Sequence, residues 1–203
     1  MENQGDEIQC KITFVGESNV GKTSLIQQYV NKVFDPNYLT TIGGDQLMKP
    51  IVINDKKINL NIWDTAGQER FRSINKIFLK NSKIVILVYD ITNKKSFDKI
   101  VEFWYPKVIE ILGNDIIIGL AANKSDLYEL ETINIEQVKQ FAQEKNLIFK
   151  ETSAMNHDCV ESFFQELIQL FFEKNKDNIC DNTVNLSSIS SQDNNKKNRC
   201  CSN

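Results

Sequence analysis

Residues 16–23 read Gly-Glu-Ser-Asn-Val-Gly-Lys-Thr, a composition and spacing typical of loops that bind phosphate. In the pattern G-x-x-x-x-G-K-[ST], backbone N–H groups surround the phosphates, the lysine reaches the terminal phosphates, and the final hydroxyl binds Mg²⁺. We therefore expect Lys22 to contact phosphate and Thr23 to bind the metal. The alternative interpretation of this motif alone is an ordinary loop with an incidental lysine.

A second polar run, Asp64-Thr65-Ala66-Gly67-Gln68-Glu69, directly follows an apolar segment that ends at Trp63. An aspartate at a strand end can hold Mg²⁺ through a water molecule. A glycine three residues later allows a backbone N–H to approach a γ-phosphate, because no Cβ intervenes. Gln68 is then placed to orient an attacking water, although on its own it would be interpreted as a solvent-exposed glutamine.

A third run, Asn123-Lys124-Ser125-Asp126, follows another apolar segment and indicates which base is bound. An ionised carboxylate only accepts hydrogen bonds, so Asp126 pairs with the ring N–H and amino group of guanine. Adenine lacks that ring N–H, and the unpaired carboxylate would cost orders of magnitude in affinity. We expect further base contacts from Asn123, from the Lys124 stem and Phe34 on the two ring faces, and from backbone N–H groups of residues 151–154.

A fourth run, Tyr38-Leu39-Thr40-Thr41-Ile42-Gly43, carries two adjacent hydroxyls. Either threonine can bind Mg²⁺ only while a third phosphate is present. Such a contact would order the loop in one nucleotide state and release it in the other.

Strands and helices are expected to alternate along the chain. Apolar runs near 9–16, 47–53, 58–63, 83–89, 116–122 and 147–150 predict strands, and helical patterns predict helices near 22–31, 69–80, 94–112, 135–145 and 159–174. Two of the strand runs are continuously apolar, as in strands buried on both faces of a parallel sheet. Pro50 places its strand at a sheet edge, and residues 54–57 predict a hairpin. The fold class is α/β: a P-loop-type, doubly wound six-stranded sheet, mostly parallel with one antiparallel edge strand, with helices on both faces.

Composition limits the possible functions of this 203-residue chain. The net charge of −3 and the lack of a basic stripe argue against binding nucleic acid. Five cysteines without zinc-ligand or disulfide spacing favour a reducing cytosol. No signal peptide or membrane-spanning run is expected. We predict a flexible N-terminus (1–8), a nucleotide-binding domain (9–174) and a flexible tail (175–203) rich in Asn, Ser, Asp and Lys.

Taken together, these motifs resemble those of the small GTPases of the Ras superfamily, and among them the Rab family. The resemblance covers roughly residues 8–174. Its most Rab-like runs are WDTAGQERF, from Trp63 to Phe71, and VYDIT, from Val88 to Thr92. It implies a switch that binds GTP and GDP with Mg²⁺, hydrolyses GTP slowly, and recruits effectors for vesicle traffic in the GTP state.

The resemblance also implies roles for individual residues. Thr41 becomes the magnesium ligand beside Thr23, with Asp64 acting through water, Gly67 senses the γ-phosphate, and Gln68 is the catalytic residue that positions water. The remaining nucleotide contacts are assigned to Ser18, Asn19, Val20, Gly21, Lys22, Ser24, Phe34, Tyr38, Asn123, Lys124, Asp126, Ser153, Ala154 and Met155.

The chain departs from the family pattern at a few positions. Asn19 stands where many relatives have glycine, and asparagine tolerates a left-handed backbone better than most residues. Met155 replaces a usual lysine, and Gly44 and Gln46 fall where Rabs usually carry an aliphatic residue and a phenylalanine. Gln46, Trp63 and Phe78 occupy the positions of the family's effector-reading hydrophobic patch, so one of its usual aromatic residues is missing.

The chain ends in Cys200-Cys201-Ser202-Asn203, which resembles a double geranylgeranylation site. Two lipid chains hold a protein stably on a bilayer. The resemblance implies a monomer on the cytoplasmic face of intracellular membranes, with a soluble cytosolic pool. The CCSN ending and residues 112–116 resemble endocytic Rabs, whereas Gly16-Glu17 and residues 70–74 resemble Golgi-associated ones, and we favour endosomal membranes. Its expected partners are an exchange factor, a GTPase-activating protein, a GDP-dissociation inhibitor, a Rab escort protein and effectors.

Two other classes of function are possible from the motifs alone. One is an ATP-using kinase or ATPase on the same phosphate loop, against which Asp126 argues. The other is a scaffold that binds guanine nucleotide without turnover, against which Gly67 and Gln68 argue.

Overall fold

Six apolar runs of the sequence form the strands of one sheet in the computed structural model, which describes residues 8–35, 45–65 and 75–176. The strand order is β2-β3-β1-β4-β5-β6, and only the β2–β3 pair is antiparallel. The strands are β1 (Ile8–Val15), β2 (Asp45–Ile53), β3 (Lys56–Asp64), β4 (Ile84–Asp90), β5 (Ile117–Asn123) and β6 (Ile148–Glu151). The predicted fold class is confirmed.

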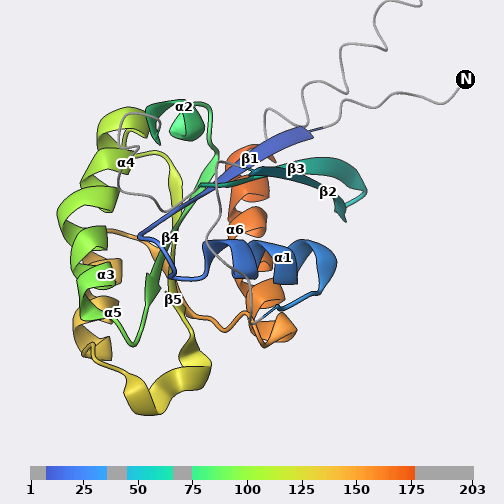
Figure 1. The fold of residues 1–203 in the computed structure, drawn as a ribbon. Helices are drawn as coiled ribbons and strands as arrows, with labels where there is room; N and C mark the ends of the chain where they lie inside the picture. The colour runs from blue at the N-terminus through green and yellow to red at the C-terminus, as the bar shows by residue number, and fades with distance from the viewer. Residues whose placement is uncertain (1–7, 36–44, 66–74, 177–203) are drawn as a thin grey trace, which may run out of the picture.

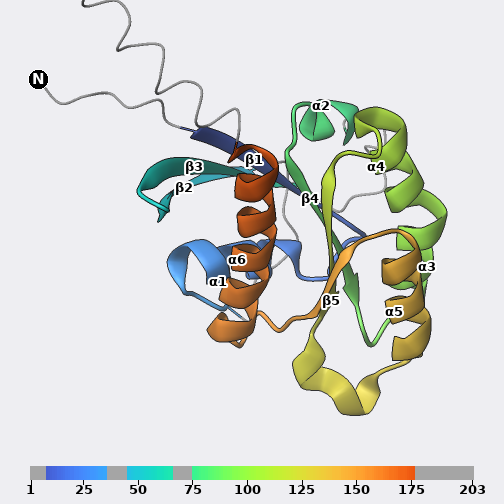
Figure 2. The same cartoon turned by 180° about the vertical axis from the view of Figure 1, so that it is seen from behind.

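Helices cover both faces of the sheet, as the views from the front and from behind show (Figures 1 and 2). One face packs against α1 (Lys22–Asn31) and α6 (His157–Lys174). The other face packs against α2 (Asn75–Leu79), α3 (Lys94–Lys99), α4 (Tyr105–Leu112) and α5 (Ile135–Glu144). Each face therefore has its own apolar core.

The burial of each strand follows its sequence pattern. Every residue of the continuously apolar strands β4 and β5 is buried, as expected for the centre of a parallel sheet. Residues of β3 alternate between buried and half-buried from Ile58 to Asp64. β2 is an edge strand, so the missing N–H of Pro50 is tolerated there.

Most predicted strands and helices shift by one or two residues at their ends, and the hairpin, the helix 94–112 and the segment after β5 differ in kind. The hairpin connection is the two-residue turn Asn54-Asp55 rather than residues 54–57, because both residues take a positive φ (48° and 61°) that suits a tight turn between twisted strands. The predicted helix 94–112 contains the π-helical turn η2 (Ile100–Trp104). The 3-10 segment η3 (Ser125–Leu130) was not predicted, and residues 69–74 of the predicted helix 69–80 lie outside the described residues.

Helix α6 is joined to the rest of the molecule by aromatic packing. The Tyr29 ring on α1 stacks on Phe164 with ring centroids 3.6 Å apart and planes only 3° from parallel. On its other side, Lys49 Nζ lies 3.6 Å from the Tyr29 ring centroid and donates a 2.7 Å hydrogen bond to the Tyr29 carbonyl. This cation–π contact links β2 to α1.

Within the described residues, no helix has both the length and the apolar character needed to cross a bilayer.

Asn156 caps the N-terminus of α6, and replacing it tests how much that cap stabilises the fold. Its side-chain oxygen accepts from the backbone N–H of Asp158 at 3.0 Å and of Cys159 at 3.4 Å. We predict that Asn156→Ala lowers the free energy of unfolding by about 1 kcal/mol, since two helix N–H groups lose their acceptor. Urea unfolding of the full chain measures this. Asn156→Asp keeps the acceptor and is expected to match the parent, and equal destabilisation by both variants would contradict the capping role.

Candidate functional site at the carboxyl ends of the strands

The sheet topology brings the predicted site residues to one edge. Strands β1, β3, β4, β5 and β6 run parallel, so their carboxyl ends meet there. Asp64 ends β3, Asp90 ends β4, and Asn123 ends β5 opposite Asp90 in the register. Ligands in open α/β sheets bind beyond this edge.

The phosphate loop of residues 16–21 connects β1 to α1 and has a backbone that depends on its glycines. Gly16 has φ 147°, and a Cβ there would lie 2.2 Å from the Val88 carbonyl oxygen. Gly21 has φ 94°, and a Cβ there would lie 2.3 Å from the Asn123 side-chain amide. Asn19 takes φ 62°, the left-handed conformation that asparagine is expected to tolerate. Side chains at positions 16 and 21 are therefore excluded by the close approach of neighbouring residues.

Lys22, the first residue of α1, is buried under this loop and is 5% exposed. Its Nζ donates to the Gly16 carbonyl at 2.9 Å and to the Glu17 carbonyl at 2.7 Å. Burial lowers the pKa of Lys22 to about 8, and the negative charges of Asp64 and Glu17 oppose that decrease. The ammonium group thus lies among the loop carbonyls at the N-terminus of a helix, where an anion is also stabilised by the helix dipole.

Thr23 and Asp64 come from different elements and meet at the same point. The Thr23 hydroxyl donates to Asp64 Oδ2 at 2.5 Å, and Asp64 is almost fully buried. The neighbouring Thr65 is also buried and donates to the Phe14 carbonyl at 2.6 Å, which anchors the end of β3 to β1. A hydroxyl beside a carboxylate is the hard oxygen donor set that Mg²⁺ prefers, so these residues fit the predicted metal.

Asn123 links the phosphate loop to the segment predicted to bind the base. Its side-chain amide donates to the Val20 carbonyl at 2.7 Å, and its Oδ1 accepts from the Thr152 hydroxyl at 3.4 Å. The side chain is 1% exposed. One residue therefore holds together the loop after β1, the end of β5 and the loop after β6.

Lys124 and Asp90 form an ion pair that supports the same segment. Lys124 Nζ lies 2.6 Å from Asp90 Oδ2, and Asp90 Oδ1 accepts from both the N–H (2.9 Å) and the hydroxyl (2.7 Å) of Thr92. Lys124 itself takes φ 64° and ψ 37°. This left-handed turn lets the chain leave β5 and start η3 with Asp126 in its first turn.

Asp126 is held by the loop that follows β6. Asp126 Oδ1 accepts from the Ser153 hydroxyl at 2.5 Å, and the Ser153 hydroxyl accepts from the Met155 N–H at 3.2 Å. The Ala154 carbonyl in turn accepts from the buried Gln28 side chain of α1 at 2.7 Å. These bonds bring together two of the predicted sources of base contacts, the run 123–126 and the loop after β6.

Met155 joins this network only through its backbone N–H, and the residue is 62% exposed. Phe34 follows α1 and is 37% exposed. The predicted site residues that lie outside the described part of the chain are Tyr38, Thr41, Gly67, Gln68, Cys200 and Cys201. Their roles stay predictions.

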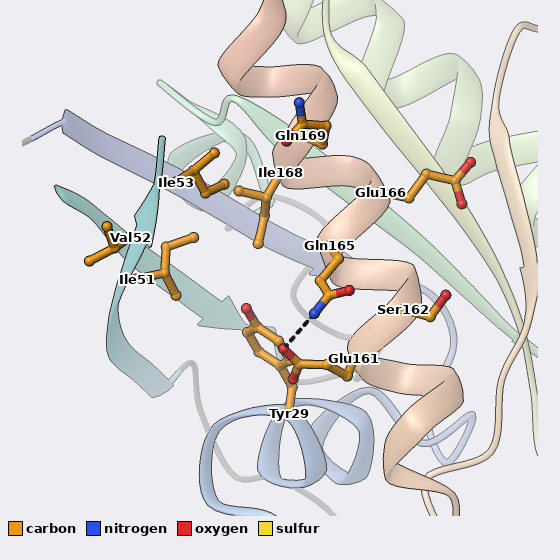
Figure 3. Close-up of a pocket in the computed structure, with 10 residues that line it drawn as sticks. All are labelled: Tyr29, Ile51, Val52, Ile53, Glu161, Ser162, Gln165, Glu166, Ile168 and Gln169. Atoms are coloured by element: carbon orange, nitrogen blue, oxygen red, sulfur yellow. Dashed lines mark hydrogen bonds between the residues drawn. The ribbon is translucent and has the colours of Figure 1, made fainter. Parts of the chain in front are cut away.

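A groove of about 720 Å³ lies elsewhere, between β2 and α6 (Figure 3). Ile51, Val52 and Ile53 form one wall, and α6 forms the other. The Gln165 amide donates to Glu161 across one helical turn at 3.3 Å, as the figure shows. The groove shares no residue with the strand-end network, and we assign the candidate site to the network.

The structure adds residues that the motifs did not single out. Asp90 has the same signal as Asp64, an acidic residue at the end of a buried strand, and it lies in the run from Val88 to Thr92. Gln28 and Thr152 are polar residues in buried positions, and no local pattern distinguishes them. The Trp104 indole N–H donates to the Glu17 carboxylate, which joins residues 87 positions apart.

Comparison with known proteins points to one family. A sequence model of the Ras family matches residues 11–173, which include every element from β1 to α6 in whole or in large part. The chain is also similar to the Ras-related protein SEC4 of Saccharomyces cerevisiae. The two are 37% identical over 196 residues, which cover 94% of this chain and 90% of that protein.

The central position of Asn123 can be tested through stability. We predict that Asn123→Ala lowers the free energy of unfolding by about 1–3 kcal/mol, because the buried Val20 carbonyl loses its donor. Asn61→Ala is the matched control: the Asn61 amide likewise donates a hydrogen bond, here to the Gln9 side chain at 2.9 Å, but at the exposed surface of the sheet. It is expected to change stability by less than about 0.5 kcal/mol. Equal effects of the two variants in urea unfolding would contradict the linking role of Asn123.

Proposed function

The chain belongs to the Ras family of small GTPases, and from this premise we propose that it is a Rab-type switch. It binds GTP and GDP with Mg²⁺, recruits effectors in the GTP state to regulate membrane traffic, and hydrolyses GTP slowly. The observation that carries the proposal is the bonded network at the strand ends, in which Asn123 connects the phosphate loop to the Asp126 segment.

The phosphates would bind within residues 16–23. Lys22 already lies against the loop carbonyls, and the positive end of α1 faces the same point. Ser18, Asn19, Val20, Gly21 and Ser24 complete the proposed contacts, mainly through backbone N–H groups. Thr23, Asp64 (through water) and Thr41 would hold Mg²⁺, which would supply positive charge to neutralise the phosphates.

The guanine base would lie against the segment 123–126 and the loop 153–155. The Asp126 carboxylate accepts the ring N–H and amino group of guanine, and the Ser153 hydroxyl keeps that carboxylate oriented. The ion pair with Asp90 fixes the Lys124 stem, which then covers one face of the base. Phe34 is proposed to cover the other face, and Ala154 and Met155 to border the base.

Hydrolysis is assigned to residues that follow β3. Gln68 orients the attacking water, and the Gly67 N–H binds the γ-phosphate. Tyr38, from the segment between α1 and β2, covers the nucleotide. The protein supplies position and electrostatic stabilisation rather than covalent chemistry, so the intrinsic rate is slow and a GTPase-activating protein is needed for fast turnover.

Membrane attachment is assigned to the end of the chain. We propose that Cys200 and Cys201 are geranylgeranylated, that residues 9–174 form the GTPase domain, and that residues 175–203 are the tether. An escort protein would deliver the chain for modification, and a GDP-dissociation inhibitor would keep a cytosolic pool. At the membrane, an exchange factor would replace bound GDP with GTP. We propose that this membrane is endosomal.

Base recognition by Asp126 is the first test. We predict that Asp126→Ala lowers the affinity for GTP at least about tenfold and leaves the weak binding of ATP unchanged, because only guanine bonds to this carboxylate. Competition of GTP and ATP against fluorescently labelled GDP measures both affinities. Glu129→Ala removes an exposed carboxylate from the same segment η3 and is expected to keep the parent's preference. A parent chain that binds both purines equally would overturn the proposed function.

The role of Gln68 is tested by single-turnover GTP hydrolysis. We predict that Gln68→Leu slows the reaction by roughly 10- to 100-fold, since loss of an oriented water costs factors of this size, while GTP binding stays intact. Gln165→Leu changes a glutamine on α6, in the groove of Figure 3, and is expected to leave the rate unchanged. An unchanged rate for Gln68→Leu, with and without an activating protein, would refute the assignment.

A further inference from the structure

Trp104 makes a hydrogen bond to the phosphate loop that the loop's motif does not require. Its indole Nε1 donates to Glu17 Oε1 at 3.0 Å, and the Trp104 side chain is 6% exposed. Glu17 occupies one of the variable positions of the phosphate-loop pattern. A bond from a largely buried donor to a carboxylate is stronger than one between neutral groups.

Glu17 is also one of the residues that hold Lys22. Its backbone carbonyl accepts from Lys22 Nζ at 2.7 Å, next to the bond from Lys22 to Gly16. The described structure gives the loop two other supports: Gly16 fits closely against the Val88 carbonyl, and the Asn123 amide holds the Val20 carbonyl. The Trp104 bond supports the loop between these two points, at the residue whose carbonyl receives the lysine.

The local sequence explains how Trp104 comes to be in this position. Trp104 ends the π-helical turn η2, in which the Tyr105 N–H bonds to the Ile100 carbonyl five residues earlier. Pro106 follows inside the continuing helix. A proline ring collides with the carbonyl four residues before it in a regular helix, and a wider π-turn passes that point without ending the helix. Such turns are frequent at functional sites.

We propose that Trp104 is a positioning residue for the phosphate loop: its indole N–H holds the Glu17 carboxylate and thereby fixes the carbonyl that binds Lys22. This inference rests on the proposed function, since the loop's ligand is taken to be a guanine nucleotide. Loss of the bond would leave residues 17–19 less firmly placed and the nucleotide would leave faster. Trp104 acts through Glu17 and does not itself contact phosphate.

Release of fluorescently labelled GDP from the full chain, displaced by excess unlabelled GDP, tests the proposal. Trp104→Phe keeps an aromatic ring and removes the donor, and Glu17→Ala removes the acceptor without changing the tryptophan. We predict that each variant releases GDP about tenfold faster, and that the double variant is no faster than either single one. Glu17→Gln retains an oxygen that accepts the indole N–H and is expected to remain within about threefold of the parent.

Controls separate positioning from general stability. Tyr105→Phe alters the next residue, whose ring packs against Phe141, and is expected to release GDP at the parent rate. Thermal unfolding of every variant shows whether faster release merely follows lost stability. If Trp104→Phe unfolds at a lower temperature and releases GDP faster, while Glu17→Ala releases GDP at the parent rate, lost stability explains the effect and the proposal is overturned.

The outcomes distinguish this inference from the proposed function. Parent-like release by Trp104→Phe and Glu17→Ala, additive effects in the double variant, or Glu17→Gln as fast as Glu17→Ala would each overturn the positioning role alone. A parent chain that binds no labelled GDP would overturn the proposed function, and this inference with it.

Discussion

The candidate site depends on one hydrogen bond, from the Asn123 side chain to the Val20 carbonyl. It spans 103 positions of sequence and joins the loop after β1 to the end of β5. Gly21 makes it possible, because any Cβ at that position would collide with the Asn123 amide. The loop proposed to hold phosphates and the segment proposed to select the base are thereby joined, as a nucleotide spanning both would require.

The sheet fixes the position of Asn123, the donor of that hydrogen bond. β4 and β5 are buried throughout, and such strands have little freedom to shift in register. Asp90 and Asn123 stand opposite one another at their ends, and each then supports a different part of the site. Asp90 holds Lys124, and Asn123 holds the phosphate loop. Polar groups this deeply buried are costly unless paired, which makes the arrangement specific as well as stable.

Local patterns predicted the elements that carry strong periodicity. The predicted helix 22–31 has the bounds of α1, and the continuously apolar runs became the central strands β4 and β5. The comparisons confirm the resemblance to the Ras superfamily. The π-turn in the helix 94–112 was missed because a hydrophobic pattern does not show how a single proline is accommodated.

Contacts between distant residues were beyond the reach of the sequence alone. The bonds from Gln28 to Ala154 and from Trp104 to Glu17 join residues 126 and 87 positions apart. Taken alone, Gln28 and Trp104 resemble ordinary helix residues. The motifs did indicate Lys22, Thr23, Asp64, Asn123 and Asp126, because their chemistry depends on residue type and spacing. The roles given to Thr41, Gly67 and Gln68 rest on resemblance and chemistry.

A crystal structure of the full chain with GDP and Mg²⁺ tests this account most directly. We expect the diphosphate within residues 16–23, the guanine against Asp126 and the loop 153–155, and the bond from Asn123 to the Val20 carbonyl intact between them. A nucleotide bound elsewhere, or bound at this edge with that bond broken, would contradict the account.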